Sequence, residues 1–188
     1  MSPARIRRCV AAALLLLAPP AAAQEAPPEP DGYRMEAYRA PVPETLAGAT
    51  VVTTEQAHAL WSEGGAAFVD VLPSPGRPAD LPQDTIWRPK ARDDIPGSVW
   101  LPNTGHGALS PEAESYFAEG LRAATDGDMD APVVLYCKDE CWMSWNAAKR
   151  ALAMGYTNVR WYPEGTDGWA AAGHPLERRE PETDAPGA

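Results

Sequence analysis

Short β-branched hydrophobic runs alternate along the chain with segments in which apolar residues recur at helical spacing. The runs at 51–52, 67–72, 98–101, 133–136 and 159–162 predict five strands. The run at 133–136 is apolar without interruption, which is typical of a strand that is buried on both faces of a parallel sheet.

Helix signals separate these runs. Residues 53–56 carry the signature of a helix cap, and Ser110 followed by Pro111 begins a second helix that extends through Leu121. A third helix is predicted from about Ser144 to Met154, and Trp169 opens a short fourth one. Alternating strands and helices predict an α/β fold: one domain with a mostly parallel five-stranded sheet flanked by helices. Ligands of such sheets bind beyond the carboxyl ends of the strands.

The ends of the chain differ in composition from this middle part. Residues 1–23 combine three arginines, an apolar core too short to span a bilayer and Ala21-Ala22-Ala23, so they predict a secretory signal peptide. A retained anchor is the alternative. Residues 24–48 are Pro-rich and predict an extended linker, residues 49–178 form the domain, and residues 179–188 predict a flexible tail. An export signal predicts a periplasmic protein.

The charge of the chain excludes some partners. The formal net charge is −10, and loss of the three signal arginines changes it to −13. A chain this acidic has no electrostatic footprint for nucleic acid, and after removal of the signal we expect no membrane association. The mature chain keeps two cysteines, Cys137 and Cys141. In an exported protein such a pair forms a disulfide, a redox couple or a binding site for a soft metal ion.

Cys137 follows the 133–136 strand and precedes a helix, so it is predicted to lie at the floor of the crevice beyond the strand ends. Free backbone N–H groups and the helix dipole at such a position favour the thiolate. A buried core cysteine is the alternative. We assign catalytic roles to Cys137 and Cys141. The loop residues predicted to contact the substrate are Lys138, Asp139, Glu140, Trp142, Met143 and Ser144.

Several motifs in this order resemble the rhodanese-like domain over roughly residues 49–178. They are Phe68-Val69-Asp70-Val71, Ile95-Pro96-Gly97-Ser98, Tyr136-Cys137, Gly155-Tyr156 and Gly173-His174-Pro175-Leu176. With the signal peptide and the Cys141-Trp142 pair, the chain resembles the exported rhodanese-like proteins of CxxCW type that are associated with PQQ-dependent catabolism. The resemblance implies a functional link to a PQQ-dependent alcohol dehydrogenase or its associated cytochrome c.

The loop departs from the usual rhodanese pattern, which places an arginine and a glycine after the cysteine. Here Lys138 is the only cation in the loop, beside Asp139 and Glu140. Like charges repel an anionic donor, so thiosulfate is a doubtful substrate. Arg88, Lys90 and Arg92 would supply positive charge if they lay near the loop, although a solvated surface cluster is the alternative.

Three hypotheses for the site stay open. In the first, the Cys137 thiolate carries a persulfide or exchanges with Cys141, which is within disulfide reach. In the second, the chain is a non-catalytic binding module for a quinoprotein dehydrogenase or its cytochrome, and Trp142 contacts the partner. In the third, Cys137, Cys141 and Met143 hold Cu(I), with His106 or His174 as a further ligand. We assign no metal site and no cofactor.

Overall fold

The computed structural model describes residues 26–182, apart from 79, 83 and 89. The predicted signal peptide at 1–23 lies outside the described residues, as do residues 183–188 of the predicted tail. Within the described part of the chain, no helix combines the length and the hydrophobicity needed to cross a membrane.

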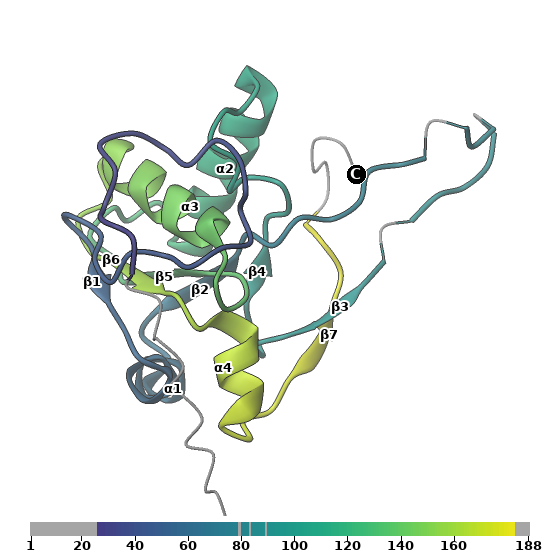
Figure 1. Cartoon of the computed structure of the whole chain (residues 1–188). Coiled ribbons are helices and arrows are strands. Elements are labelled where there is room, and N and C mark those ends of the chain that lie inside the picture. Colours follow the sequence, from purple (N-terminus) through teal and green to yellow (C-terminus); the bar gives the residue numbers. More distant parts are fainter. Residues whose placement is uncertain (1–25, 79, 83, 89, 183–188) are drawn as a thin grey trace, which may run out of the picture.

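A five-stranded parallel sheet forms the centre of the domain, which confirms the predicted fold class (Figure 1). Its spatial order is β1-β6-β5-β2-β4, and every neighbouring pair is parallel. The strands are β1 (Thr50–Val51), β2 (Ala67–Asp70), β4 (Val99–Trp100), β5 (Val133–Tyr136) and β6 (Val159–Tyr162). The middle strand β5 is buried along its whole length, as its uninterrupted apolar run predicts.

Helices cover both faces of the sheet. The helices are α1 (Thr54–Glu63), α2 (Pro111–Ala124), α3 (Trp142–Ala153) and α4 (Gly165–Ala171). Helices α2 and α3 cover one face, whereas α1 and α4 cover the other (Figure 1). Two hydrophobic clusters follow this division: Leu135 belongs to the cluster under α2 and α3, and its neighbour Tyr136 belongs to the cluster under α1 and α4. Cys137 continues the alternation, so its side chain lies on the α2 and α3 side.

Local sequence signals explain where these helices begin. Thr53 and Gln56 form a reciprocal capping box at the start of α1, and Ser110 caps α2 ahead of Pro111. Helix α3 begins at Trp142, two residues before the predicted start, because Cys141 takes the N-cap position. Helix α4 begins at Gly165 rather than at Trp169.

The described part of the Pro-rich segment, residues 26–48, contains no helix, but it does not run free of the domain as a linker. We call residues 33–46 the strap. Figure 1 shows the strap running across the outer side of α3. The Trp145 Nε1–H group donates to the carbonyl oxygen of Thr45 at 3.1 Å, and Leu46 is only 3% exposed. The domain therefore includes residues that the sequence pattern assigned to a linker.

The end of the domain also extends beyond the predicted boundary at residue 178. Strand β7 (Glu177–Arg179) pairs antiparallel with β3 (Arg92–Asp94) in a small second sheet. The backbone N–H of Glu182 then donates to the carbonyl oxygen of Trp100 at 3.0 Å. The chain is held at the edge strand β4 as far as Glu182, so the first four residues of the predicted flexible tail are fixed to the domain.

Candidate functional site

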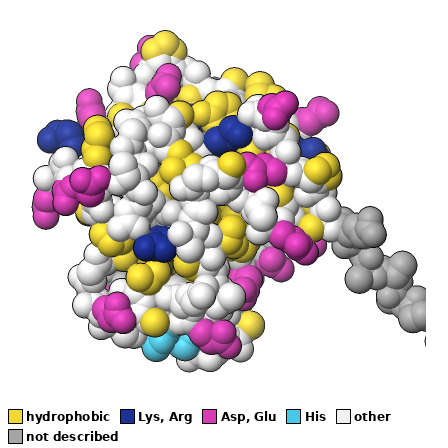
Figure 2. Space-filling model, turned by 90° about the vertical axis from the view of Figure 1, so that its left-hand side faces the viewer, with side chains coloured by type: hydrophobic (Ala, Val, Ile, Leu, Met, Phe, Trp, Pro, Cys, Tyr) yellow, Lys and Arg dark blue, Asp and Glu magenta, His cyan; other side chains and the backbone are white. Residues whose placement is uncertain are grey.

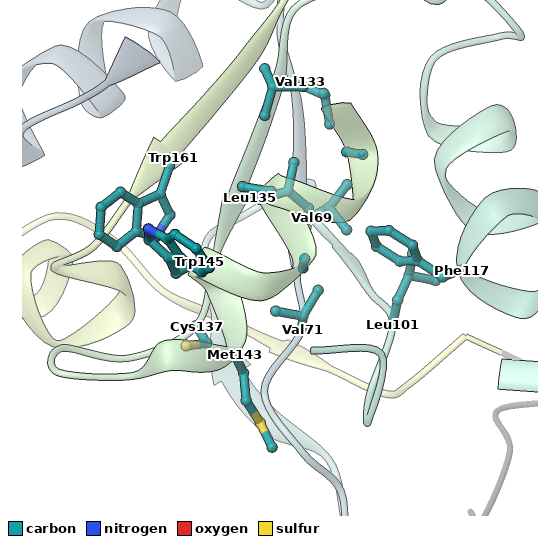
Figure 3. Close-up of a cluster of buried hydrophobic side chains, with 14 of the residues drawn as sticks. Val69, Val71, Leu101, Phe117, Val133, Leu135, Cys137, Met143, Trp145 and Trp161 are labelled. Carbon is teal, nitrogen blue, oxygen red and sulfur yellow. The ribbon is translucent and has the colours of Figure 1, made fainter. Parts of the chain in front are cut away.

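Cys137 lies directly beyond β5, but its thiol is not at the surface. The residue is 0% exposed and belongs to the hydrophobic cluster under α2 and α3. Figure 3 shows Cys137 and Met143 at the end of this cluster that is far from Val133. The prediction of an accessible thiol at the floor of a crevice is therefore wrong for this conformation, because the alternation along β5 directs the Cys137 side chain under α3.

The peptide of Cys137 is fixed by the loop that begins α4. Its carbonyl oxygen accepts hydrogen bonds from the Thr166 N–H at 3.0 Å and from the Thr166 hydroxyl at 3.2 Å. Gly165 packs so closely that a β-carbon there would lie 2.4 Å from the same oxygen. Gly165 also has φ +52, a conformation that favours glycine. These contacts hold the end of β5 in place.

Cys141 sits at the N-cap of α3 and is 2% exposed. The chain reaches it through a tight turn in which Glu140 has φ +48 and its N–H donates to Asp139 Oδ1 at 2.9 Å. The Cys141 carbonyl oxygen accepts from the Ser144 hydroxyl at 3.1 Å and from the Cys137 thiol at 3.6 Å. The turn therefore brings the two cysteines together, as their four-residue spacing predicts.

The two thiols differ in acidity. Burial raises the pKa of Cys137 well above its ordinary value, and its hydrogen bond with Cys141 raises it further. The same hydrogen bond is the largest cause that lowers the pKa of Cys141, to about 6. The N–H groups of Met143 and Lys138 and the charge of Arg39 lower it as well. The two pKa values are therefore shifted in opposite directions, and Cys141 is the more acidic of the two thiols.

The strap covers this pair. Arg39 forms an antiparallel bridge with Cys141, and the Ala40 N–H donates to the Glu140 carbonyl oxygen at 3.1 Å. On the other side of the bridge, the Trp142 N–H donates to the Tyr38 carbonyl oxygen at 2.9 Å. Backbone pairing along both sides of Cys141 explains why an N-cap residue in a polar turn is nearly inaccessible.

The predicted substrate-contacting residues divide into two groups. Lys138, Asp139 and Glu140 have solvent-accessible side chains, and Lys138 Nζ lies 3.9 Å from Asp167 Oδ1. The second group is buried and performs structural roles. Its members are Trp142, Met143 and Ser144.

Trp142 was the best sequence candidate for contact with a partner, but the strap buries it. Its Nε1–H donates to the Pro41 carbonyl oxygen at 3.0 Å, and the Arg34 guanidinium lies 5.1 Å from the ring centroid. Ser144 accepts a hydrogen bond from Trp161 Nε1 at 3.0 Å and supports the Cys141 carbonyl. Neither side chain is available to a ligand in this conformation.

Arg92 is a site residue that the sequence offered only as one of three loop cations, together with Arg88 and Lys90. It donates to Asp70, which is 0% exposed, and to Thr166 Oγ1 at 2.9 Å. Thr166 in turn binds the Cys137 carbonyl, so a chain of contacts joins Asp70 to the cysteine loop. Of the three loop cations, Arg92 alone belongs to this chain of contacts. The side chains of Arg88 and Lys90 are exposed to solvent. No sequence signal separates Arg92 from its neighbours.

A hollow of about 330 Å³ lies beyond the strand ends, beside Arg92, Lys138, Thr166 and Leu72. It is on the carbonyl side of Cys137 and does not reach the thiols, which lie on the α3 side of the sheet. Among the described residues, no three His, Cys, Asp or Glu side chains gather as a metal-ligand set. His174 stacks on His58 with ring centroids 3.9 Å apart, and His106 packs on Tyr38.

The chain is similar to several known proteins. Similar solved structures include a polysulfide-sulfur transferase from Wolinella succinogenes, with 19% identity, a TM-score of 0.45 and coverage of 71% of this chain and 81% of that one. A thiosulfate sulfurtransferase from Pseudomonas aeruginosa has 20% identity and a TM-score of 0.47 over 71% of this chain and 21% of that one. No curated protein matches the chain significantly. The family model described as "Rhodanese-like domain" matches residues 53–172, more than half of the 188 residues. The chain therefore belongs to the rhodanese-like domain family.

Proposed function

We propose that this protein is a periplasmic thiol–disulfide protein in which Cys141 is the attacking thiolate and Cys137 is the resolving thiol. The observation that carries the proposal is the contact between the two cysteines in one enclosed turn: the Cys137 thiol donates to the Cys141 carbonyl oxygen at 3.6 Å, and Cys141 takes the N-cap position of α3. The pKa of Cys141 is lowered there, whereas that of Cys137 is raised. These roles are the reverse of those that the sequence pattern indicates. A single buried core cysteine would explain neither the pairing nor the low pKa of Cys141.

The exchange proceeds in two balanced steps. The Cys141 thiolate attacks one sulfur of a partner disulfide, so a Cys141–partner bond forms, the partner bond breaks and one partner sulfur leaves as a thiolate. Cys137 then gives its proton to that leaving thiolate, and its sulfur attacks Cys141. The internal disulfide forms, and the second partner sulfur leaves. Two electrons pass from the cysteine pair to the partner disulfide.

Sulfur transfer through a persulfide is the second candidate, and membership of the rhodanese-like family supports it. The N–H groups of Lys138 and Met143 that stabilise the Cys141 thiolate would also stabilise a terminal sulfur anion. A persulfide adds one sulfur atom, whereas both cysteines are almost fully enclosed. After disulfide exchange the product is an internal disulfide with no added atom, so this resting state fits the closed site better than a resting persulfide does. Asp139 and Glu140 still argue against thiosulfate as a donor.

Features of the sequence support the periplasmic location and the link to PQQ-dependent alcohol oxidation. The signal-like residues 1–23 and the resemblance to exported CxxCW-type proteins support service to a PQQ-dependent alcohol dehydrogenase or its cytochrome c. The acidic character argues against a nucleic-acid partner. On the face in Figure 2, acidic side chains are spread widely and the basic ones form no continuous patch.

Mass spectrometry of protein isolated from periplasm without reductant tests the chemistry. We expect a mass lower by two hydrogen atoms, restored by a dithiol reductant, because an oxidising compartment converts the pair to a disulfide. A product heavier by one sulfur atom would select the persulfide candidate instead. If both cysteines were free thiols and reacted with neither disulfide nor persulfide reagents, even slowly, the disulfide-exchange and persulfide candidates would both be overturned.

The proposed link to alcohol oxidation can be tested by growth of the source bacterium on an alcohol whose oxidation requires a PQQ-dependent dehydrogenase. A strain without this protein should grow more slowly, and the wild-type gene should restore growth. A gene with both Cys137→Ala and Cys141→Ala should fail to restore it, although the protein accumulates to the same level. Equal growth of all strains would contradict the link to alcohol oxidation without touching the cysteine chemistry.

A further inference from the structure

The strap contacts the cysteine loop as an extended peptide. The Ala40 N–H and the Tyr38 carbonyl oxygen pair with the backbone on both sides of Cys141, at 3.1 and 2.9 Å. The bridge between Arg39 and Cys141 places these two residues opposite each other in an antiparallel register. This is the geometry of strand addition, in which main-chain hydrogen bonds hold an extended segment.

Helix α3 extends this recognition of the main chain. The Trp142 and Trp145 indoles donate to the carbonyl oxygens of Pro41 and Thr45, at 3.0 and 3.1 Å. The Asn146 side chain accepts from the Arg34 N–H and donates to the Arg34 carbonyl oxygen, both at 2.9 Å. Side chains of α3 therefore make four hydrogen bonds to backbone groups of three strap residues. Such a site recognises an extended backbone, and the buried side chain of Leu46 adds an apolar contact.

Access to the Cys141 sulfur depends on whether the strap occupies this site. Cys141 is 2% exposed with the strap in place, so a partner disulfide reaches its sulfur only after the strap has moved away. Removal of the strap exposes the same backbone donors and acceptors beside Cys141. Unpaired groups of this kind recruit another extended segment. Any segment bound there has one residue directly opposite Cys141, at the position that Arg39 now occupies.

We propose that the surface of the cysteine loop and α3 covered by residues 33–46 is a binding site for an extended polypeptide segment of a partner that carries a cysteine or a disulfide. The strap is the intramolecular occupant of this site between reactions. The proposal rests on the thiol–disulfide function above and names its substrate class as a polypeptide, not a small inorganic sulfur compound.

The test uses the full chain with Ala40→Pro, which removes the N–H that donates to Glu140 and so weakens the strap. Ala40→Ser is the matched control because it keeps the N–H and has a similar size. The probe is a fluorescent peptide with the sequence of residues 33–45, which contains no cysteine. Its control is the same peptide with an N-methyl group at the position of Ala40.

We expect the Ala40→Pro protein to bind the peptide saturably in fluorescence anisotropy, roughly fivefold more tightly than Ala40→Ser does, because one strap hydrogen bond is lost. N-methylation should weaken the peptide by a similar factor. Absent binding, or equal binding of the methylated peptide, would overturn the proposal. This readout needs no thiol chemistry, so peptide binding with inert cysteines would instead contradict the proposed function.

Hydrogen exchange on the wild-type protein provides a second measurement if Ala40→Pro fails to fold. Excess peptide should accelerate exchange of the Ala40 N–H, because displacement of the strap leaves this group open to water. The N-methylated peptide should accelerate it less. Unchanged exchange with a saturating concentration of the unmodified peptide would overturn the proposal independently of any variant.

Discussion

Gly165 packs directly on the carbonyl group of Cys137, so closely that a β-carbon at Gly165 would lie 2.4 Å from the carbonyl oxygen and 2.7 Å from the carbonyl carbon. This contact joins the start of α4 to the end of β5. Together with the two hydrogen bonds from Thr166, it fixes the peptide from which the cysteine loop departs. The position of the thiols therefore depends on a glycine that is 28 residues later in the sequence.

Gly165→Ala should destabilise the fold by about 3 kcal/mol, from the steric overlap and the positive φ together. Gly173→Ala is the control: φ there is +77, but no atom lies within 4 Å of the added carbon, so we expect a loss of about 1 kcal/mol. Urea denaturation of both variants measures the difference. Equal losses would show that the contact with Cys137 contributes nothing.

Arg92→Ala should cost about 3 kcal/mol, because it leaves the fully buried Asp70 carboxylate without its cation and Thr166 without a donor. Arg178→Ala removes an exposed ion pair with Asp93 at 3.8 Å and should change the free energy of unfolding by less than about 0.5 kcal/mol. Thermal or urea unfolding compares the two variants. A loss for Arg92→Ala no larger than that for Arg178→Ala would contradict the role given to this pair.

The ultraviolet absorbance of the thiolate should titrate with a midpoint near pH 6, the pKa of Cys141. Cys137→Ala removes the hydrogen bond that lowers this pKa most, so the midpoint should move upward. Cys141→Ser should abolish the transition near pH 6. If the transition survived in Cys141→Ser and vanished in Cys137→Ala, the acidities assigned to the two thiols would be exchanged.

Stability should depend on pH through the same group. The pKa of Cys141 is lower in the folded state than its ordinary value near 9, so between about pH 6 and 9 the unfolded chain binds more protons. The free energy of unfolding should rise with pH across this window, and the contribution should disappear as pH falls through 6. Urea titrations at several pH values measure it, with Cys141→Ser as the control that lacks the slope.

The sequence pattern predicted the elements that depend on local signals. The apolar run of β5, the capping box of α1 and the Ser110-Pro111 start of α2 each specify their element within a few residues. Strand β3 carried no such signal, because its residues Arg92–Asp94 are all charged and pair with the equally charged Glu177–Arg179. Backbone hydrogen bonds hold edge pairs of this kind. The pattern of hydrophobic residues does not detect such bonds, so it does not predict these strands.

For the site, the sequence predicted the pairing of the two cysteines but not their burial. The four-residue spacing at a helix start correctly brings Cys137 and Cys141 together, since it is a local relationship. Their burial is not local: the strap residues that cover them precede the loop by about 100 positions, and Arg39 reaches Asp139 across that separation. A Pro-rich composition predicts an extended chain but not the surface on which it lies. The reversed acidity follows from that enclosure and from the hydrogen bond between the thiols.

Disulfide trapping tests the central claim most directly. Reduced wild-type, Cys137→Ala and Cys141→Ala proteins are treated with glutathione disulfide, and intact masses are followed with time. The wild type should lose two hydrogen atoms and retain no glutathione, whereas Cys137→Ala should retain one glutathione on Cys141. Cys141→Ala should react at least roughly tenfold more slowly, because its remaining thiol is protonated and buried. Rapid trapping on Cys137 in the Cys141→Ala protein, with an unreactive Cys137→Ala protein, would contradict the account.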